Sequence, residues 1–368
     1  MLRMAFLISL AASLTFTSVA YATSSERLYY AAKGGYFQAA KNLVEVDRAS
    51  TAYANPINGE TALFVTTQAG NYQMTEYLLE KRANPNQPNL DRLYPLHLSS
   101  QTNNFPMVRL LLEGGAYAGP IDLDGNTPLH HAARFNNMQM FELLLEKKAP
   151  AGHVNKDRLA PIHFASRLGN TAMVKLLLEK GAAADPIDAE GVSPIHLASQ
   201  TGNLAMVKLL VDAKANVNAV KKDGVTPLHE ASAAGHLSVA RYLIKNGAST
   251  EARTIGGWIA LHHAARFGHT RIASTLLYNG APINKRTNDG KTIFDLAKLG
   301  NQDGMLKFLK KYARRKGKRI PRARKPVAAS IAQAASVPRP ASSKTASSST
   351  ALDKLGLDAS AVAALLGN

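Results

Sequence analysis

The chain has 368 residues, of which 46% are hydrophobic, so it has ample material for a buried core. It contains no cysteine, which excludes disulfides, thiolate nucleophiles and cysteine-ligated zinc and leaves the redox compartment unmarked. The formal net charge of +18 is concentrated near one end. Residues 26–305 hold 29 Lys+Arg and 24 Asp+Glu, whereas residues 307–344 hold 13 basic residues and no acidic one.

The first 22 residues have the pattern of an export signal. A basic start at Arg3 is followed by an apolar run from Ala5 to Ala20 and by an Ala-Tyr-Ala site that ends at Ala22. This arrangement predicts a signal peptide over residues 1–22, cleaved before Thr23. A membrane anchor fits less well, because the run falls short of the ~20 apolar residues needed to span a bilayer. We expect an exported, periplasmic or secreted protein, and the alanine-rich signal is typical of bacteria.

A tetrapeptide of the form Thr-Pro-Leu-His then recurs every 33 residues, beginning at positions 61, 94, 127, 160, 193, 226, 259 and 292. In the copy at Thr127, the hydroxyl is placed to cap free amides and Pro128 suits the first position of a helix. Nine residues after each start stands glycine or asparagine, the residues that best tolerate a left-handed backbone. A short first helix is therefore predicted to end at Gly70, Asn103, Asn136, Gly169, Gly202, Gly235, Gly268 and Asn301.

A second helix is predicted after each of these stops. Its apolar spacing, as in Met173, Val174 and Leu177, is broad enough to be buried by neighbours on both sides. Pairs such as Asp124-Gly125 favour tight turns in the stretch that leads to the next unit. Arg92 and Arg158 occupy the glycine position of that turn, so we expect backbone strain there.

The 33-residue period and the Thr-Pro-Leu-His motif resemble the ankyrin family over about residues 26–312. A unit that begins at Arg27 fits as the N-terminal cap, and Ile293 and Asp295 replace the usual Pro and His in the last unit. The resemblance implies an all-α repeat solenoid of about nine helix-turn-helix units with β-hairpin tips, spanning residues 23–312. We expect it to be a monomer.

The recurring histidines are the main candidates for chemistry. They stand at the fourth place of the motif, where the resemblance implies a hydrogen-bonding role within the scaffold: His97, His130, His163, His196, His229 and His262. No metal-ligand spacing, nucleophile elbow or phosphate-binding loop accompanies them. We therefore predict no metal, no cofactor and no enzymatic activity.

In ankyrin arrays the partner is usually held on the concave side, by the hairpin tips and the first helices. Large apolar residues at the tips, and three arginines that each precede an apolar residue at the end of a first helix, suit a protein interface. The predicted partner-binding residues are Arg134, Phe135, Leu159, Arg167, Leu168, Trp258, Arg266 and Phe267. The alternative for Trp258 is that it packs on its own neighbouring hairpin.

The segment after the repeats, residues 313–350, is first basic and then rich in Ala, Ser and Pro, which predicts a disordered linker. Residues 351–368 are predicted to form a short apolar helix. The predicted anionic-surface residues are Arg314, Arg315, Lys316, Lys318, Arg319, Arg322, Arg324 and Lys325. They form a solvated tail, a contact to an anionic membrane or glycan, or a contact to nucleic acid, which is the least favoured because no aromatics are interleaved.

These features together predict an exported scaffold that binds a protein partner through its concave face while its basic tail contacts an anionic surface. One alternative is a secreted effector that acts on host-cell proteins through the same face. The other is a binder of anionic polymers or nucleic acid that acts through the tail alone.

Overall fold

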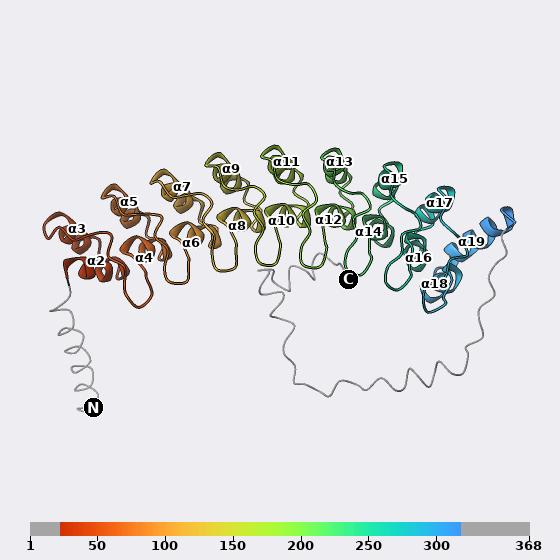
Figure 1. Cartoon of the computed structure of the whole chain (residues 1–368), viewed down its shortest axis with the longest axis horizontal. Coiled ribbons are helices and arrows are strands. Elements are labelled where there is room, and N and C mark those ends of the chain that lie inside the picture. Colours follow the sequence, from red (N-terminus) through yellow and green to blue (C-terminus); the bar gives the residue numbers. More distant parts are fainter. Residues whose placement is uncertain (1–22, 318–368) are drawn as a thin grey trace, which may run out of the picture. The chain divides into compact units, whose positions relative to one another are not determined.

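The computed structural model describes residues 23–317, and within this range the chain forms helices arranged in nine successive pairs (Figure 1). The first helices of the pairs are α2 (Ser24–Lys33), α4 (Ala62–Gln68), α6 (Pro95–Gln101), α8 (Pro128–Arg134), α10 (Pro161–Arg167), α12 (Pro194–Thr201), α14 (Pro227–Ala234), α16 (Ala260–Arg266) and α18 (Ile293–Leu299). The second helices are α3 (Phe37–Glu45), α5 (Tyr72–Glu80), α7 (Phe105–Glu113), α9 (Met138–Glu146), α11 (Thr171–Glu179), α13 (Leu204–Asp212), α15 (Leu237–Lys245), α17 (Thr270–Tyr278) and α19 (Asp303–Arg315).

The described residues form an all-α repeat solenoid, as predicted. First helices stack on first helices and second helices on second helices, with the long hairpin loops beside the first helices (Figure 1). The tips contain no continuous strand in this range, only isolated bridges between Ala54 and Thr61 and between Arg286 and Thr292. The linker predicted over residues 313–350 begins too early, because α19 continues to Arg315. The rest of the linker beyond residue 317, the predicted signal peptide over residues 1–22 and the predicted helix at 351–368 lie outside the described residues. None of the described helices is long and apolar enough to cross a membrane.

The predicted ends of the first helices are confirmed. All eight Gly and Asn positions have a left-handed backbone, with φ between 54° at Asn103 and 85° at Gly235. The predicted strain at two hairpin turns is also confirmed, because Arg92 and Arg158 have φ of 53° and 60° where other units use glycine. Four second helices are likewise followed by a left-handed basic residue: Arg48, Arg82, Lys148 or Lys214.

The predicted capping role of Thr127 is wrong. Its hydroxyl makes no capping bond to a helix amide, and lies 2.9 Å from Nδ1 of His130 instead. Only where the histidine is missing does the threonine hydroxyl accept an amide hydrogen bond, as Thr61 does from Phe64 N at 3.1 Å. The five second helices α5 to α13 use asparagine for this purpose, for example Asn170, whose Oδ1 accepts from Met173 N at 3.0 Å.

The core lies between the two layers of helices and runs along the stack. Side chains such as Val174, Leu177 and Leu210 are completely buried because each contacts both its own unit and a neighbour. Buried apolar side chains form one cluster from Leu96 to Ala313 and a second from Leu28 to Ala83. Each unit is therefore stabilised mainly by adjacent units.

Candidate functional site

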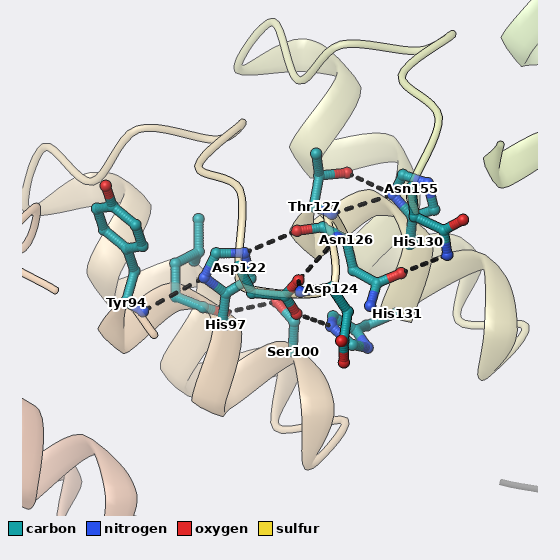
Figure 2. Close-up of polar contacts among 11 residues, drawn as sticks. Tyr94, His97, Ser100, Asp122, Asp124, Asn126, Thr127, His130, His131 and Asn155 are labelled. Carbon is teal, nitrogen blue, oxygen red and sulfur yellow. Dashed lines mark hydrogen bonds and ion pairs between the residues drawn. The ribbon is translucent and has the colours of Figure 1, made fainter. Parts of the chain in front are cut away.

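The hairpin tips are built by a side chain that closes its own turn. At the tip before α8, Asp122 Oδ1 accepts hydrogen bonds from the backbone N–H of Asn126 at 2.7 Å and of Asp124 at 3.0 Å. Gly125 follows with φ of 80°, as the tight turn requires. Figure 2 shows this tip between the first helices α6 and α8. The turn holds the residues around it in a fixed position.

From the unit of His97 to that of His262, a buried histidine bonds each unit to the hairpin of the next one. His97 Nδ1 accepts the N–H of Tyr94 at 3.3 Å, and Nε2 faces the carbonyl oxygen of Asn126 in the next tip at 3.1 Å (Figure 2). Because an N–H only donates and a carbonyl only accepts, the ring is the neutral tautomer with its proton on Nε2. His130 repeats the arrangement with Leu159 O at 3.1 Å.

Protonation of these histidines is unfavourable. Burial lowers the pKa of His97 to about 4 and that of His130 to about 3, and a second proton on Nδ1 would face the bonded N–H. The rings therefore act as fixed spacers between units and have no free position for acid-base exchange. Within residues 23–317, no three His, Asp or Glu side chains gather closely enough to hold a metal ion.

The arginine and apolar pairs predicted for partner binding lie at the C-terminal end of the first helices α8, α10 and α16. Phe135, Leu168 and Phe267 are 39%, 44% and 52% exposed, respectively. The guanidinium of Arg134 lies over the Phe135 ring, 5.1 Å from its centre. Its Nε is buried and has no hydrogen-bond partner among the described residues.

The eight predicted residues do not form one continuous patch. The pairs on α8 and α10 are adjacent, but the two units that follow carry Gln200-Thr201 and Ala233-Ala234 at the same place. Arg266 and Phe267, on α16, therefore lie three units away from Arg167. Trp258 lies at the opposite end of α16, because it precedes that helix whereas Phe267 follows it.

Two predicted tip residues offer less contact area than expected. Leu159 is only 9% exposed, so its prediction as a partner contact is wrong, and its carbonyl instead receives the His130 hydrogen bond. Trp258 is half-buried, with its ring centre 4.9 Å from that of His263. The tryptophan therefore packs largely on the first helix of its own unit.

An exposed aliphatic row at the outermost tip position was missed. Ile57, Leu90 and Leu123 occupy the same position in three consecutive hairpins and are 85%, 67% and 47% exposed. The tips are linked by backbone bonds such as Leu90 N to Asn58 O at 2.8 Å. The 33-residue recurrence of the row is visible in the sequence, four residues before each motif.

The predicted anionic-surface residues are described only in part. Arg314 and Arg315 end α19, Lys316 follows, and all three side chains are exposed. The other five, Lys318, Arg319, Arg322, Arg324 and Lys325, lie outside the described residues.

The stacked helix pairs, with exposed side chains on closed tips, define a helical repeat array. Comparison with protein families agrees. Three matches described as Ankyrin repeats (3 copies) cover residues 28–122, 96–188 and 162–254, and one described as Ankyrin repeat covers residues 256–288. The chain belongs to the ankyrin-repeat family, whose members are typically non-enzymatic scaffolds for protein partners. A comparison with curated proteins gave no match.

Proposed function

We propose that the chain is an exported scaffold that binds a protein partner through the face formed by its hairpin tips and first helices. The observation that carries the proposal is the exposed row of Ile57, Leu90 and Leu123 on tips fixed by hydrogen bonds. Aliphatic side chains held in place bury area on binding without a large loss of side-chain entropy. Export is supported by the signal-like residues 1–22.

The arginine and apolar pairs add both charged and apolar contacts to this face. Phe135 offers apolar area, and Arg134 beside it carries a positive charge, so together they suit a ligand segment with an apolar group next to a carboxylate. The basic tail contacts an anionic surface in this proposal, which keeps the scaffold where its partner is found.

Proximity labelling around the full chain, followed by binding measurements with the purified partner, tests the proposal. We expect the Leu90→Ser and Leu123→Ser double variant to lose the partner captured by the parent. Val46→Ser is the matched control, because Val46 is also an exposed aliphatic residue but follows the second helix α3. Unchanged capture by the double variant, or equal loss in the control, would show that the tips are not the binding face.

Two further measurements test export and the tail. N-terminal sequencing of the protein recovered outside the cytoplasm should begin at Thr23, and an intact Met1 in a membrane fraction would contradict cleavage. Replacing the five basic residues 318, 319, 322, 324 and 325 by serine should weaken salt-sensitive binding to anionic vesicles while leaving partner binding unchanged. Loss of partner binding in that variant would favour the tail as the active part.

A further inference from the structure

The last exposed position of the second helices changes its charge along the array. In five consecutive second helices, α5, α7, α9, α11 and α13, this position is acidic: Glu80, Glu113, Glu146, Glu179 and Asp212. The same 33-residue register places Lys245 in α15, Tyr278 in α17 and Lys311 in α19. The acidic residue therefore disappears at one boundary, between α13 and α15.

The overall charge changes at the same boundary. Residues 23–236 contain 20 basic and 20 acidic side chains, whereas residues 237–317 contain 15 basic and 4 acidic ones. α15 and α17 carry no acidic residue, and α19 carries only Asp303, in its first turn. The outer side of the last three units is thus a cationic surface on folded helices, separate from the tail.

A groove lies between α15 and α17 on this surface. It encloses about 580 Å³ and is lined by Arg241, Lys245 and Arg271 together with the hydroxyl groups of Ser274, Thr275 and Tyr278. α19 continues the charge beyond α17 with exposed Lys307, Lys310, Lys311, Arg314 and Arg315. The apolar side of α19, including Met305 and Leu309, is buried against the array, so its cations face solvent.

Helix stability does not account for this arrangement. Arg241 and Lys245 are like charges four residues apart on one helix, a spacing that is mildly destabilising. Arg271 lies in the first turn of α17, where the helix dipole disfavours a positive charge. Tyr278 is 89% exposed at the end of the same helix. Among residues 23–317, none of the basic residues of α15, α17 and α19 forms an ion pair.

We propose that the outer face of α15, α17 and α19 docks onto an anionic phospholipid bilayer. The cations lie on three adjacent helices with a spacing of roughly 8–10 Å, so they cover a broad surface that matches many headgroups at once. Tyr278 projects from the middle helix, and tyrosine is enriched at the membrane interface, where its ring and hydroxyl lie at headgroup depth. This inference extends the anionic contact proposed for the tail to a folded surface, and it leaves the tips free for a protein partner.

The test is co-sedimentation of the full chain with vesicles of neutral lipid, alone or mixed with an anionic phospholipid. The variant Arg241→Glu with Lys245→Glu reverses two of the three cations that line the groove and leaves the tail intact. Since each basic residue near an anionic bilayer contributes about fivefold, we expect partitioning onto anionic vesicles to fall about 25-fold or more. Tyr278→Ser should weaken binding severalfold without changing its dependence on salt.

The matched control reverses the charge of two other exposed residues by Arg109→Glu with Lys175→Glu. Arg109 and Lys175 occupy the position of Arg241 in earlier units. This control should bind vesicles as the parent does, and unchanged circular dichroism should show that each variant is folded. The proposal is overturned if the two reversals on α15 have no effect, if the control loses as much binding, or if the surface prefers nucleic acid to vesicles. The serine tail variant reports separately on the tail, so failure of one contact is distinguishable from failure of the other.

Discussion

Acid should unfold this protein through its buried histidines. The folded chain lowers the pKa of His97, His196, His262 and His263 to about 4 each, and burial is the main cause. The unfolded chain takes up these protons near the ordinary pKa of about 6.5. Stability is therefore complete above about pH 6.5 and falls as the pH is lowered towards 4, because the unfolded state binds more protons.

The magnitude follows from these pKa values. At about pH 5, a histidine with a folded pKa of about 4 has lost about 2 kcal/mol of stabilisation relative to neutral pH. The four together lose on the order of 8 kcal/mol, which is comparable to the entire unfolding free energy of about 5–15 kcal/mol for a typical domain. Asp122 contributes little at pH 5, because its ordinary pKa of 3.8 and its folded pKa of about 2 both lie below 5, so it is ionised in both states. Burial raises the folded pKa, and His131 and the Asn126 N–H lower it by more.

Urea unfolding followed by far-ultraviolet circular dichroism at neutral pH and at about pH 5 measures the effect. We expect the free energy of unfolding to be much smaller at pH 5 than at neutral pH. Calorimetry at pH 5 should also detect protons taken up by the chain as it unfolds. If the unfolding free energy is the same at both pH values, the histidines are not held neutral by the fold and the inter-unit bonds have been assigned incorrectly.

Three further predictions concern single sites or units. Arg158→Gly should raise the free energy of unfolding by about 0.5–1 kcal/mol, because it relieves the left-handed backbone of the arginine by more than it adds flexibility to the unfolded chain. Gly125→Arg should lower the free energy of unfolding, and the opposite order of the two variants in chemical denaturation would contradict strain at Arg158. Phe267→Ala should reduce partner affinity by about 2 kcal/mol with little change in the thermal unfolding midpoint, because Phe267 is exposed. Leu177→Ala should lower the free energy of unfolding by about 2–5 kcal/mol, because Leu177 is buried, and a comparable loss of stability in both variants would place Phe267 in the core. Deletion of residues 160–192, one complete unit, should leave a folded array with helical circular dichroism. Deletion of 33 residues that begin within a helix should lose helical signal, and an equal loss of signal in both variants would contradict nearest-neighbour stacking.

The fold could be predicted because the repeat places the same physical requirement at the same position eight times. Left-handed residues such as Gly202 and Asn136 end the first helices where the sequence indicates, and Arg158 is strained as expected. The role of Thr127 could not be predicted, because its hydroxyl can bond either a helix amide or a histidine ring, and only the rotamers of both side chains decide between them.

The binding face was predicted less well than the fold. Leu159 and Leu123 are both leucines near a hairpin tip, yet Leu159 is 9% exposed and Leu123 is 47% exposed, because they occupy different positions of the hairpin. Trp258 was weighed as either a contact or a packing residue, and its position against His263 depends on a neighbouring helix. Side-chain exposure at a tip depends on the adjacent unit, which the local sequence does not describe.

The bonds of the motif histidines run in one direction along the array. Each of these rings donates towards the C-terminus, as His196 does to Val225 O at 3.2 Å, so a unit that carries the histidine bonds to its successor. The last described unit carries Asp295 instead, whose Oδ2 accepts from the Thr292 N–H at 2.9 Å and from its hydroxyl at 2.7 Å. Gene duplication of a unit with the histidine therefore adds one bond between units, whereas an upstream copy of the final unit would add none. The next tip would keep only the backbone bond of its own hairpin, such as that from Asp122 N to Asn126 O at 3.0 Å.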